Sequence, residues 1–167
     1  RARSIDLSRL PIGPEYQVEV AFLYDVLTGE STRLGSCIGR NYPKPTDSQI
    51  CFTVDVLRVD KDKSTVYVWD YKTGRSTPPT PTAAFQTNMA ALGVARHYAC
   101  ERAEVFFIHI PDFIPYFYSG KLDEIDLAQF ANRLKRMREK IIAAATLISE
   151  GKQPRLTRGD HCTWCPA

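Results

Sequence analysis

The sequence predicts an α/β fold in which helices flank a mixed central β-sheet. Three observations support this fold class. Runs of β-branched and aromatic residues dominate the chain up to residue 71, and a run of helix-forming residues follows at 83–100. A short apolar run at 104–110 then separates this helix from a longer amphipathic pattern at 127–148. Strands and helices therefore alternate in the second half of the chain.

The first part of the chain is expected to form four strands. Residues 16–27 are rich in Val, Phe, Leu and Tyr, and a Thr-Gly-containing turn connects them to a hairpin partner at 33–38. After a proline-containing loop, strands follow at 50–59 and 65–71, joined by a short charged turn. Because the turns are short, these strands predict an antiparallel meander.

The second part predicts two helices and one or two strands. Thr80 is the expected N-cap of the first helix and Pro81 its first residue. After the strand at 104–110, residues 113–118 predict a weaker strand because Pro115 interrupts it. The last helix carries an apolar stripe at spacings of three and four, and Gly151 is its expected C-terminal cap. The stripe comprises Leu127, Phe130, Leu134, Met137, Ile141, Ala145 and Ile148.

Length and composition limit the class of protein. A chain of 167 residues accommodates one domain with a hydrophobic core, and we expect a single domain over 1–167 with an irregular cysteine-bearing tail at 152–167. The chain opens on Arg1 and stops directly after a cysteine motif, which indicates a fragment of a longer chain. The apolar content of 44% and the charged content of 25% are ordinary for a soluble globular protein.

Charge and cysteine usage point to an intracellular protein. The net charge of +3 permits a polyanionic partner without requiring one. No apolar run is long enough to cross a bilayer, so no membrane partner is expected. Five cysteines are an odd number without the spacing of a disulfide scaffold, which favours a reducing, cytoplasmic setting.

Residues with catalytic potential cluster between Asp55 and Gln86. Asp70 and Lys72 are two positions apart at the end of a predicted strand, so they share one face of it, and Asp55 lies on the preceding strand. Two carboxylates can converge on a divalent cation, and a neighbouring ammonium can stabilise an anionic transition state. This combination is what metal-assisted phosphodiester hydrolysis requires. For Asp-x-Lys taken alone, the alternative is a surface ion pair.

These residues resemble the PD-(D/E)XK nuclease superfamily, and within it the RecB-like exonuclease group. The resemblance rests on Asp55, on the run Asp70-Tyr-Lys-Thr-Gly74 and on Gln86 in the following helix. It implies a restriction-endonuclease-like core. Two positions depart from the family pattern, since Phe52 stands where the family often has Gly, and Ala90 where it usually has Tyr.

The resemblance also implies a role for each site residue. Asp55 and Asp70 would ligate Mg²⁺ or Mn²⁺ together with the backbone carbonyl of Tyr71. Lys72 would orient the attacking water or neutralise the scissile phosphate, and Gln86 would position the lysine or the substrate. Glu19, on the first predicted strand, fits the additional acid that many members place ahead of the first aspartate.

The tail contains a pair of candidate metal ligands. Cys162 and Cys165 have the Cys-x-x-Cys spacing that serves zinc or an iron–sulfur cluster equally well. The segment resembles the one that closes the iron–sulfur-bearing members of the group, which implies a [4Fe-4S] cluster in the full-length protein. His161 is the residue that would complete a zinc site instead.

The sequence therefore predicts a metal-dependent DNA nuclease. The resemblance favours an exonuclease that acts in DNA end processing, recombination or repair in a bacterial or phage setting. DNA is the expected partner, together with a helicase or recombination protein. Two alternatives remain open: a catalytically inactive nucleic-acid-binding module of nuclease fold, and a structural zinc protein.

Overall fold

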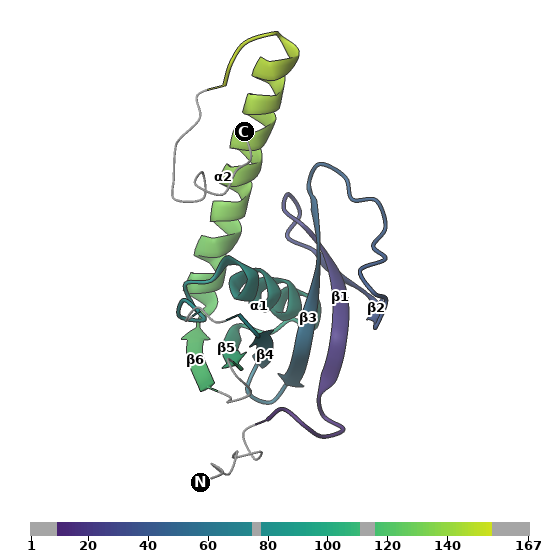
Figure 1. Ribbon diagram of the computed structural model, residues 1–167, viewed down its shortest axis with the longest axis vertical. Coiled ribbons are helices and arrows are strands. Elements are labelled where there is room, and N and C mark those ends of the chain that lie inside the picture. The colour runs from purple at the N-terminus through teal and green to yellow at the C-terminus, as the bar shows by residue number, and fades with distance from the viewer. Residues whose placement is uncertain (1–9, 75–77, 111–115, 155–167) are drawn as a thin grey trace.

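A computed structural model describes residues 10–74, 78–110 and 116–154 (Figure 1). In these ranges, six strands form one mixed sheet and two helices pack against it, which confirms the predicted α/β class and the order of the elements. The strands are β1 (Gln17–Asp25), β2 (Ser31–Ser36), β3 (Gln49–Asp60), β4 (Thr65–Lys72), β5 (Arg102–His109) and β6 (Tyr116–Leu122), and the helices are α1 (Phe85–Tyr98) and α2 (Glu124–Ser149).

The strand order in the sheet is β2-β1-β3-β4-β5-β6. β4 and β5 are parallel, with α1 as the crossover between them, and every other neighbouring pair is antiparallel. The predicted meander is wrong at one place, because β1 lies between β2 and β3. The cause is burial: Val20, Ala21 and Phe22 of β1 are fully buried, whereas β2 is polar and has no fully buried residue. β2 therefore occupies the edge, where side chains can face water on both sides.

Both helices cover the same face of the sheet. Leu92 and Val94 of α1 and Leu127 and Phe130 of α2 belong to the main core cluster together with side chains of β1, β3, β4 and β5. A smaller cluster around Trp69 lies on the opposite face, where Tyr67 of the same strand and Phe106 of β5 stack on it. The face beneath α1 is the one that carries the site residues described below.

α1 begins later than its sequence signal indicates. Thr80 is not its N-cap; the helix starts at Phe85 after Ala84, which makes no side-chain capping hydrogen bond. The reason is local, since the Thr87 hydroxyl donates to the carbonyl of Pro81 and the Asn88 amide donates to that of Thr82. These bonds hold the residues before the helix in a separate turn, and they place Gln86 in the first turn of α1.

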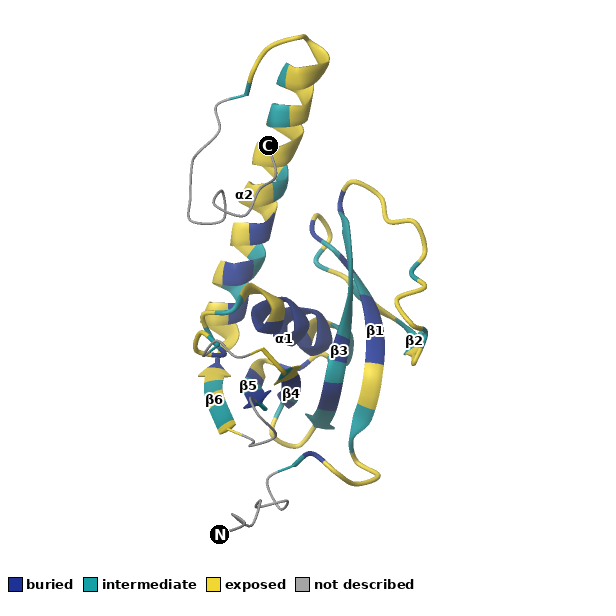
Figure 2. Ribbon diagram, viewed as in Figure 1, coloured by how far each residue is buried: buried dark blue, intermediate teal, exposed yellow. Residues whose placement is uncertain are grey.

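α2 has the predicted amphipathic face, but only its first half is buried. A capping box between Asp123 and Asp126 starts the helix. Within the predicted stripe, Leu127, Phe130 and Leu134 are buried, whereas Met137, Ile141 and Ile148 are exposed. The helix runs beyond the sheet and α1, so its outer half has no layer to pack against in the described part of the chain (Figure 2). Gly151 follows the helix with a φ of +71°, as expected for a terminal glycine.

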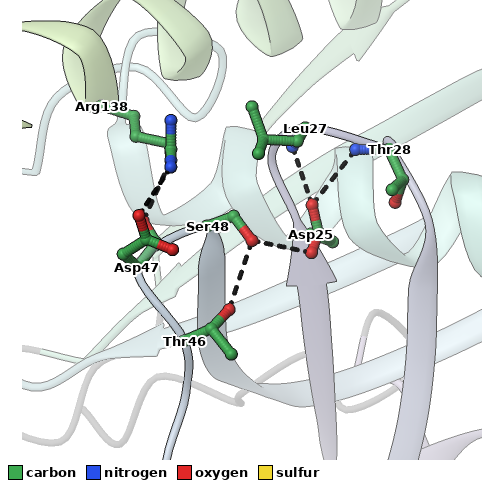
Figure 3. A network of polar contacts seen from close by, with 7 residues as sticks. All are labelled: Asp25, Leu27, Thr28, Thr46, Asp47, Ser48 and Arg138. Carbon is green, nitrogen blue, oxygen red and sulfur yellow. Dashed lines mark hydrogen bonds and ion pairs between the residues drawn. The ribbon is translucent and has the colours of Figure 1, made fainter.

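A polar network ties α2 to the loop between β2 and β3 (Figure 3). Arg138 of α2 makes a 2.7 Å ion pair with Asp47, and Ser48 donates a 2.9 Å hydrogen bond to Asp25 at the end of β1. Burial raises the pKa of Asp25, but hydrogen bonds from the following turn and from Ser48 outweigh it, so this pKa lies below its usual value. The network fixes the end of the loop that leads into β3.

Gly93 allows α1 to lie close to Phe52 of β3. A Cβ atom at residue 93 would overlap the tip of the Phe52 ring, whose face stacks on Phe22 at a centroid distance of 5.6 Å. A glycine inside a helix ordinarily costs about 1 kcal/mol relative to alanine. We expect Gly93→Ala nevertheless to lower the unfolding free energy by about 1–3 kcal/mol, because the overpacked ring has to move.

Urea denaturation of a double-mutant cycle measures this effect. In a Phe52→Leu background, Gly93→Ala is expected to be neutral or stabilising because the obstructing ring tip is absent. An equal loss of stability in both backgrounds would contradict this account of Gly93.

Candidate active site

β3 and β4 place Asp55 and Asp70 beside each other. The two strands pair antiparallel with Val56 opposite Trp69 and Leu57 opposite Val68. The same register, continued by one residue, sets Asp55 opposite Asp70. Both side chains line one narrow crevice with Gln86 at the first turn of α1. The predicted acids therefore meet on one side of the sheet.

β1 and β3 both deviate from regular strand geometry next to these acids. Val54 and Leu57 both belong to the core cluster under α1 although they are three positions apart, so the alternation of β3 is interrupted between them. On β1, Glu19 has a φ of +48°, an uncommon conformation for a residue other than glycine. Its strand neighbours pair as Val20 with Val54 and Val18 with Val56, so Glu19 lies opposite Asp55. Both acids line the same pocket.

Asp70 is the most deeply buried of the acids, with 6% of its surface exposed. Its Oδ2 atom lies 2.6 Å from the Lys72 Nζ atom as an ion pair, but it accepts no hydrogen bond of regular geometry in the described structure. Burial raises the pKa of Asp70, the Lys72 ammonium opposes that change and the Asp55 carboxylate adds to it. The net result is a pKa above the ordinary aspartate value.

Asp55 and Lys72 are each held by a second contact. The Tyr71 backbone N–H donates a 2.8 Å hydrogen bond to Asp55 Oδ2. Lys72 Nζ donates a 2.8 Å hydrogen bond to Gln86 Oε1 and lies 5.2 Å from the centre of the Phe107 ring. The structure thus brings Glu19, Asp55, Asp70, Lys72 and Gln86 into one connected site.

His109 is a supporting residue that sequence reasoning did not identify. His109 is the last residue of β5 and is 97% buried. Its Nε2 atom lies 2.6 Å from the carbonyl oxygen of Gly74. Because a carbonyl only accepts, Nε2 carries the proton. His109 is also the strand partner of Lys72, and the N–H of Ile110 donates to the Lys72 carbonyl. These contacts hold the chain directly after Lys72. They depend on the parallel pairing of β4 with β5, which the sequence pattern does not show.

The two aspartates fit a divalent cation. The crevice between them has a volume of about 10 Å³, close to what one water-sized species occupies. The buried Asp70 Oδ2 has the Lys72 ammonium as its ion-pair partner but accepts no hydrogen bond of regular geometry, so it is an oxygen that a cation can also satisfy. No group of three or more His, Cys, Asp or Glu side chains suited to a metal occurs within the described residues. Mg²⁺ is commonly bound by one or two carboxylates and several waters, which matches a two-acid site.

The predicted cluster ligands lie outside the described residues. Cys162 and Cys165 belong to the range 155–167, so the structure does not test their assignment. Among the described cysteines, Cys37 is exposed, Cys51 partly buried and Cys100 buried, and all three are free thiols.

A comparison of the sequence with protein-family models places this chain in a family. Residues 26–167 match the model of the PD-(D/E)XK nuclease superfamily. A solved structure described as "Crystal structure of SSO0001" aligns with this chain at a TM-score of 0.36 and 16% sequence identity. The alignment covers 73% of this chain and 50% of the chain in that structure. No curated protein matches the chain significantly. In the described part of the chain, neither helix has the length and apolarity needed to span a membrane.

Proposed function

Because this chain belongs to the PD-(D/E)XK nuclease superfamily, we propose that it is a metal-dependent nuclease that hydrolyses phosphodiester bonds in DNA. Membership implies phosphodiester hydrolysis as the type of reaction. One observation carries the proposal for this chain: Asp55 and Asp70 line a single crevice beside Lys72, and Gln86 holds the lysine in place.

Each residue has a distinct task in the proposed reaction. Asp55 and Asp70, with the backbone carbonyl of Tyr71, would hold Mg²⁺ or Mn²⁺. When bound, the cation activates water as a nucleophile and offsets the charge of the phosphate. An ammonium group has three N–H donors, and Gln86 accepts one of those of Lys72 while Asp70 lies beside it as an ion pair. At least one donor therefore remains to stabilise the phosphate oxygens as negative charge develops on them.

Glu19 extends the acidic site. It lies across the β1–β3 pair from Asp55 and lines the same pocket. We propose that Glu19 acts as the additional acid, orienting water or a second cation next to Asp55. The left-handed backbone at Glu19 is the observation that supports this, because strained conformations concentrate at functional sites.

The finer aspects of the function rest on sequence resemblance. We propose exonuclease action of the RecB-like type in DNA end processing, recombination or repair, supported by the order of Asp55, the Asp70–Gly74 run and Gln86. Cys162 and Cys165 support a [4Fe-4S] cluster in the full-length protein. A helicase or recombination partner, a cytoplasmic location and a single domain over 1–167 stay predictions.

A nuclease assay on linear and covalently closed circular DNA tests the proposal. With Mn²⁺ or Mg²⁺, we expect linear DNA to be degraded from its ends and circular DNA to be spared. EDTA should prevent the degradation of the linear DNA. Equal cleavage of the two forms would contradict exonuclease action but would leave the nuclease activity itself supported. No cleavage of either form with any divalent cation, together with retained DNA binding, would instead favour the inactive nucleic-acid-binding module.

A further inference from the structure

A pocket of about 390 Å³ opens beside the catalytic acids. This volume falls in the range of about 300–1,000 Å³ that is usual for small-molecule sites. Asp55 and Gln86 line both this pocket and the narrow crevice that contains Asp70. The pocket therefore adjoins the proposed catalytic site, and its occupant would lie next to the bond to be cut.

Aromatic and apolar side chains form much of the pocket wall. Phe85, at the start of α1, leaves 42% of its surface exposed although it is a large apolar residue. The partly buried Phe52 of β3 and the buried Met89 of α1 also line the pocket. Exposed aromatic surface beside a polar site is typical of places where a planar ligand stacks.

The loop between β2 and β3 forms the remaining wall. The hydroxyl groups of Tyr42 and Thr53 lie 2.6 Å apart, which holds the Tyr42 ring against β3 at the pocket. Arg40, next to it on the same loop, is exposed and also lines the pocket. The end of this loop is fastened by the network of Asp25, Ser48 and Arg138 seen in Figure 3. The pocket thus combines fixed aromatic rings with one cation suited to a phosphate.

We propose that this pocket receives one unpaired base of the DNA strand being cut, so that the enzyme acts on single-stranded DNA. The base would stack on Phe85 and Tyr42, its phosphate would meet Arg40, and the adjoining linkage would reach Asp55 and Asp70. In a duplex, the same base would first have to leave its pair and its stack, which costs several kcal/mol. This inference rests on the proposed function, and the experiment below separates the two.

Binding and cleavage are measured on two single strands of equal length, oligothymidylate and an abasic deoxyribose-phosphate polymer. Fluorescence anisotropy in Ca²⁺ gives the affinity, and gel analysis in Mn²⁺ gives the cleavage rate. We expect the wild-type protein to bind oligothymidylate about 5- to 150-fold more tightly than the abasic strand, the range of one stacked base. We also expect a duplex of the same length to bind less tightly than the single strand.

Three variants and a control assign the preference to the pocket. Phe85→Leu removes the ring but keeps apolar volume, and it should reduce the preference for bases by at least half; Phe85→Tyr should retain it. Tyr42→Leu tests the loop wall independently if Phe85→Leu lowers the melting temperature strongly. Ile125→Ala, at an exposed apolar residue of α2 away from the pocket, should leave the preference as in wild type.

Each outcome separates the two claims. Equal binding of the two strands by the wild-type protein, equal binding of duplex and single strand, or equal behaviour of Phe85→Leu and Ile125→Ala would overturn the base pocket. Cleavage without any preference for bases would overturn the pocket and leave the nuclease function intact. Base-dependent binding with no cleavage in Mn²⁺ would do the reverse.

Discussion

Asp70→Asn is expected to abolish hydrolysis and, in EDTA at pH 7, to raise the melting temperature. Burial holds the pKa of Asp70 above its usual value, so the folded protein binds this proton more tightly than the unfolded chain does. The stabilising contribution of Asp70 is therefore complete below the ordinary aspartate pKa and is lost as pH rises through the raised one. At pH 7 the buried charge is destabilising, and asparagine removes it. Each kcal/mol gained raises the melting temperature by about 2–4 °C.

Divalent cations should make the wild-type protein more stable than Asp70→Asn, which reverses the order of melting temperatures expected in EDTA. Mn²⁺ or Mg²⁺ is expected to raise the melting temperature of the wild-type protein, because the cation binds the folded state only. At a cation concentration a hundredfold above Kd, the gain in unfolding free energy is about 2.7 kcal/mol. Asp70→Asn should lose most of this response. Scanning fluorimetry in EDTA and in Mn²⁺, with DNA degradation measured in parallel, provides all of these values.

Asp60→Asn is the matched control on the neighbouring strand. A hydrogen bond from the Lys63 backbone N–H, with further help from the Lys63 side chain, holds the pKa of Asp60 below its usual value. Its stabilising contribution is present above the ordinary pKa, so removal of this charge should lower or leave unchanged the melting temperature at pH 7. If Asp70→Asn lowers the melting temperature in EDTA, or keeps the full response to Mn²⁺, the assignment of Asp70 is refuted.

Lys72→Met is expected to reduce kcat by about 10²–10³-fold, the usual effect of removing one preorganised donor from a developing oxyanion. The response of the melting temperature to Mn²⁺ should persist, because Asp55 and Asp70 remain. Rates are compared at saturating Mn²⁺, where the cation compensates the Asp70 carboxylate that loses its ion pair. This split between catalysis and metal binding distinguishes a charge-stabilising lysine from a structural one.

Lys63→Met serves as the control for Lys72. Lys63 forms a 3.3 Å ion pair with Asp60 at the surface, and its side chain is 69% exposed, so its loss should leave kcat unchanged. A Lys72→Met enzyme with near wild-type kcat, or one altered in KM alone, would show that Lys72 does not act on the reacting phosphate.

Element order and strand faces were accessible from local sequence. β4 was predicted within one residue of its end because valine and tryptophan favour strands, and the two-residue period alone places Asp70 and Lys72 on one face. The predicted pairing of acids across β3 and β4 followed from a short turn between the strands. The N-cap at Thr80 was predicted wrongly because the side chains of Thr87 and Asn88 donate hydrogen bonds to the carbonyls of Pro81 and Thr82. In a helix that began at Thr80, these carbonyls would instead accept backbone N–H groups of the next turn.

What the sequence determined by itself is the set of elements and the local chemistry of Asp55, Asp70 and Lys72, since propensity and strand period act over a few neighbouring residues. The tertiary structure alone decided three other features: the position of Glu19 opposite Asp55, the hydrogen bond from His109 to Gly74, and the pocket between Phe85 and Tyr42. Each depends on strand register or helix packing between distant segments. Strand register and helix packing depend on how the whole core is buried, and no local sequence pattern specifies this.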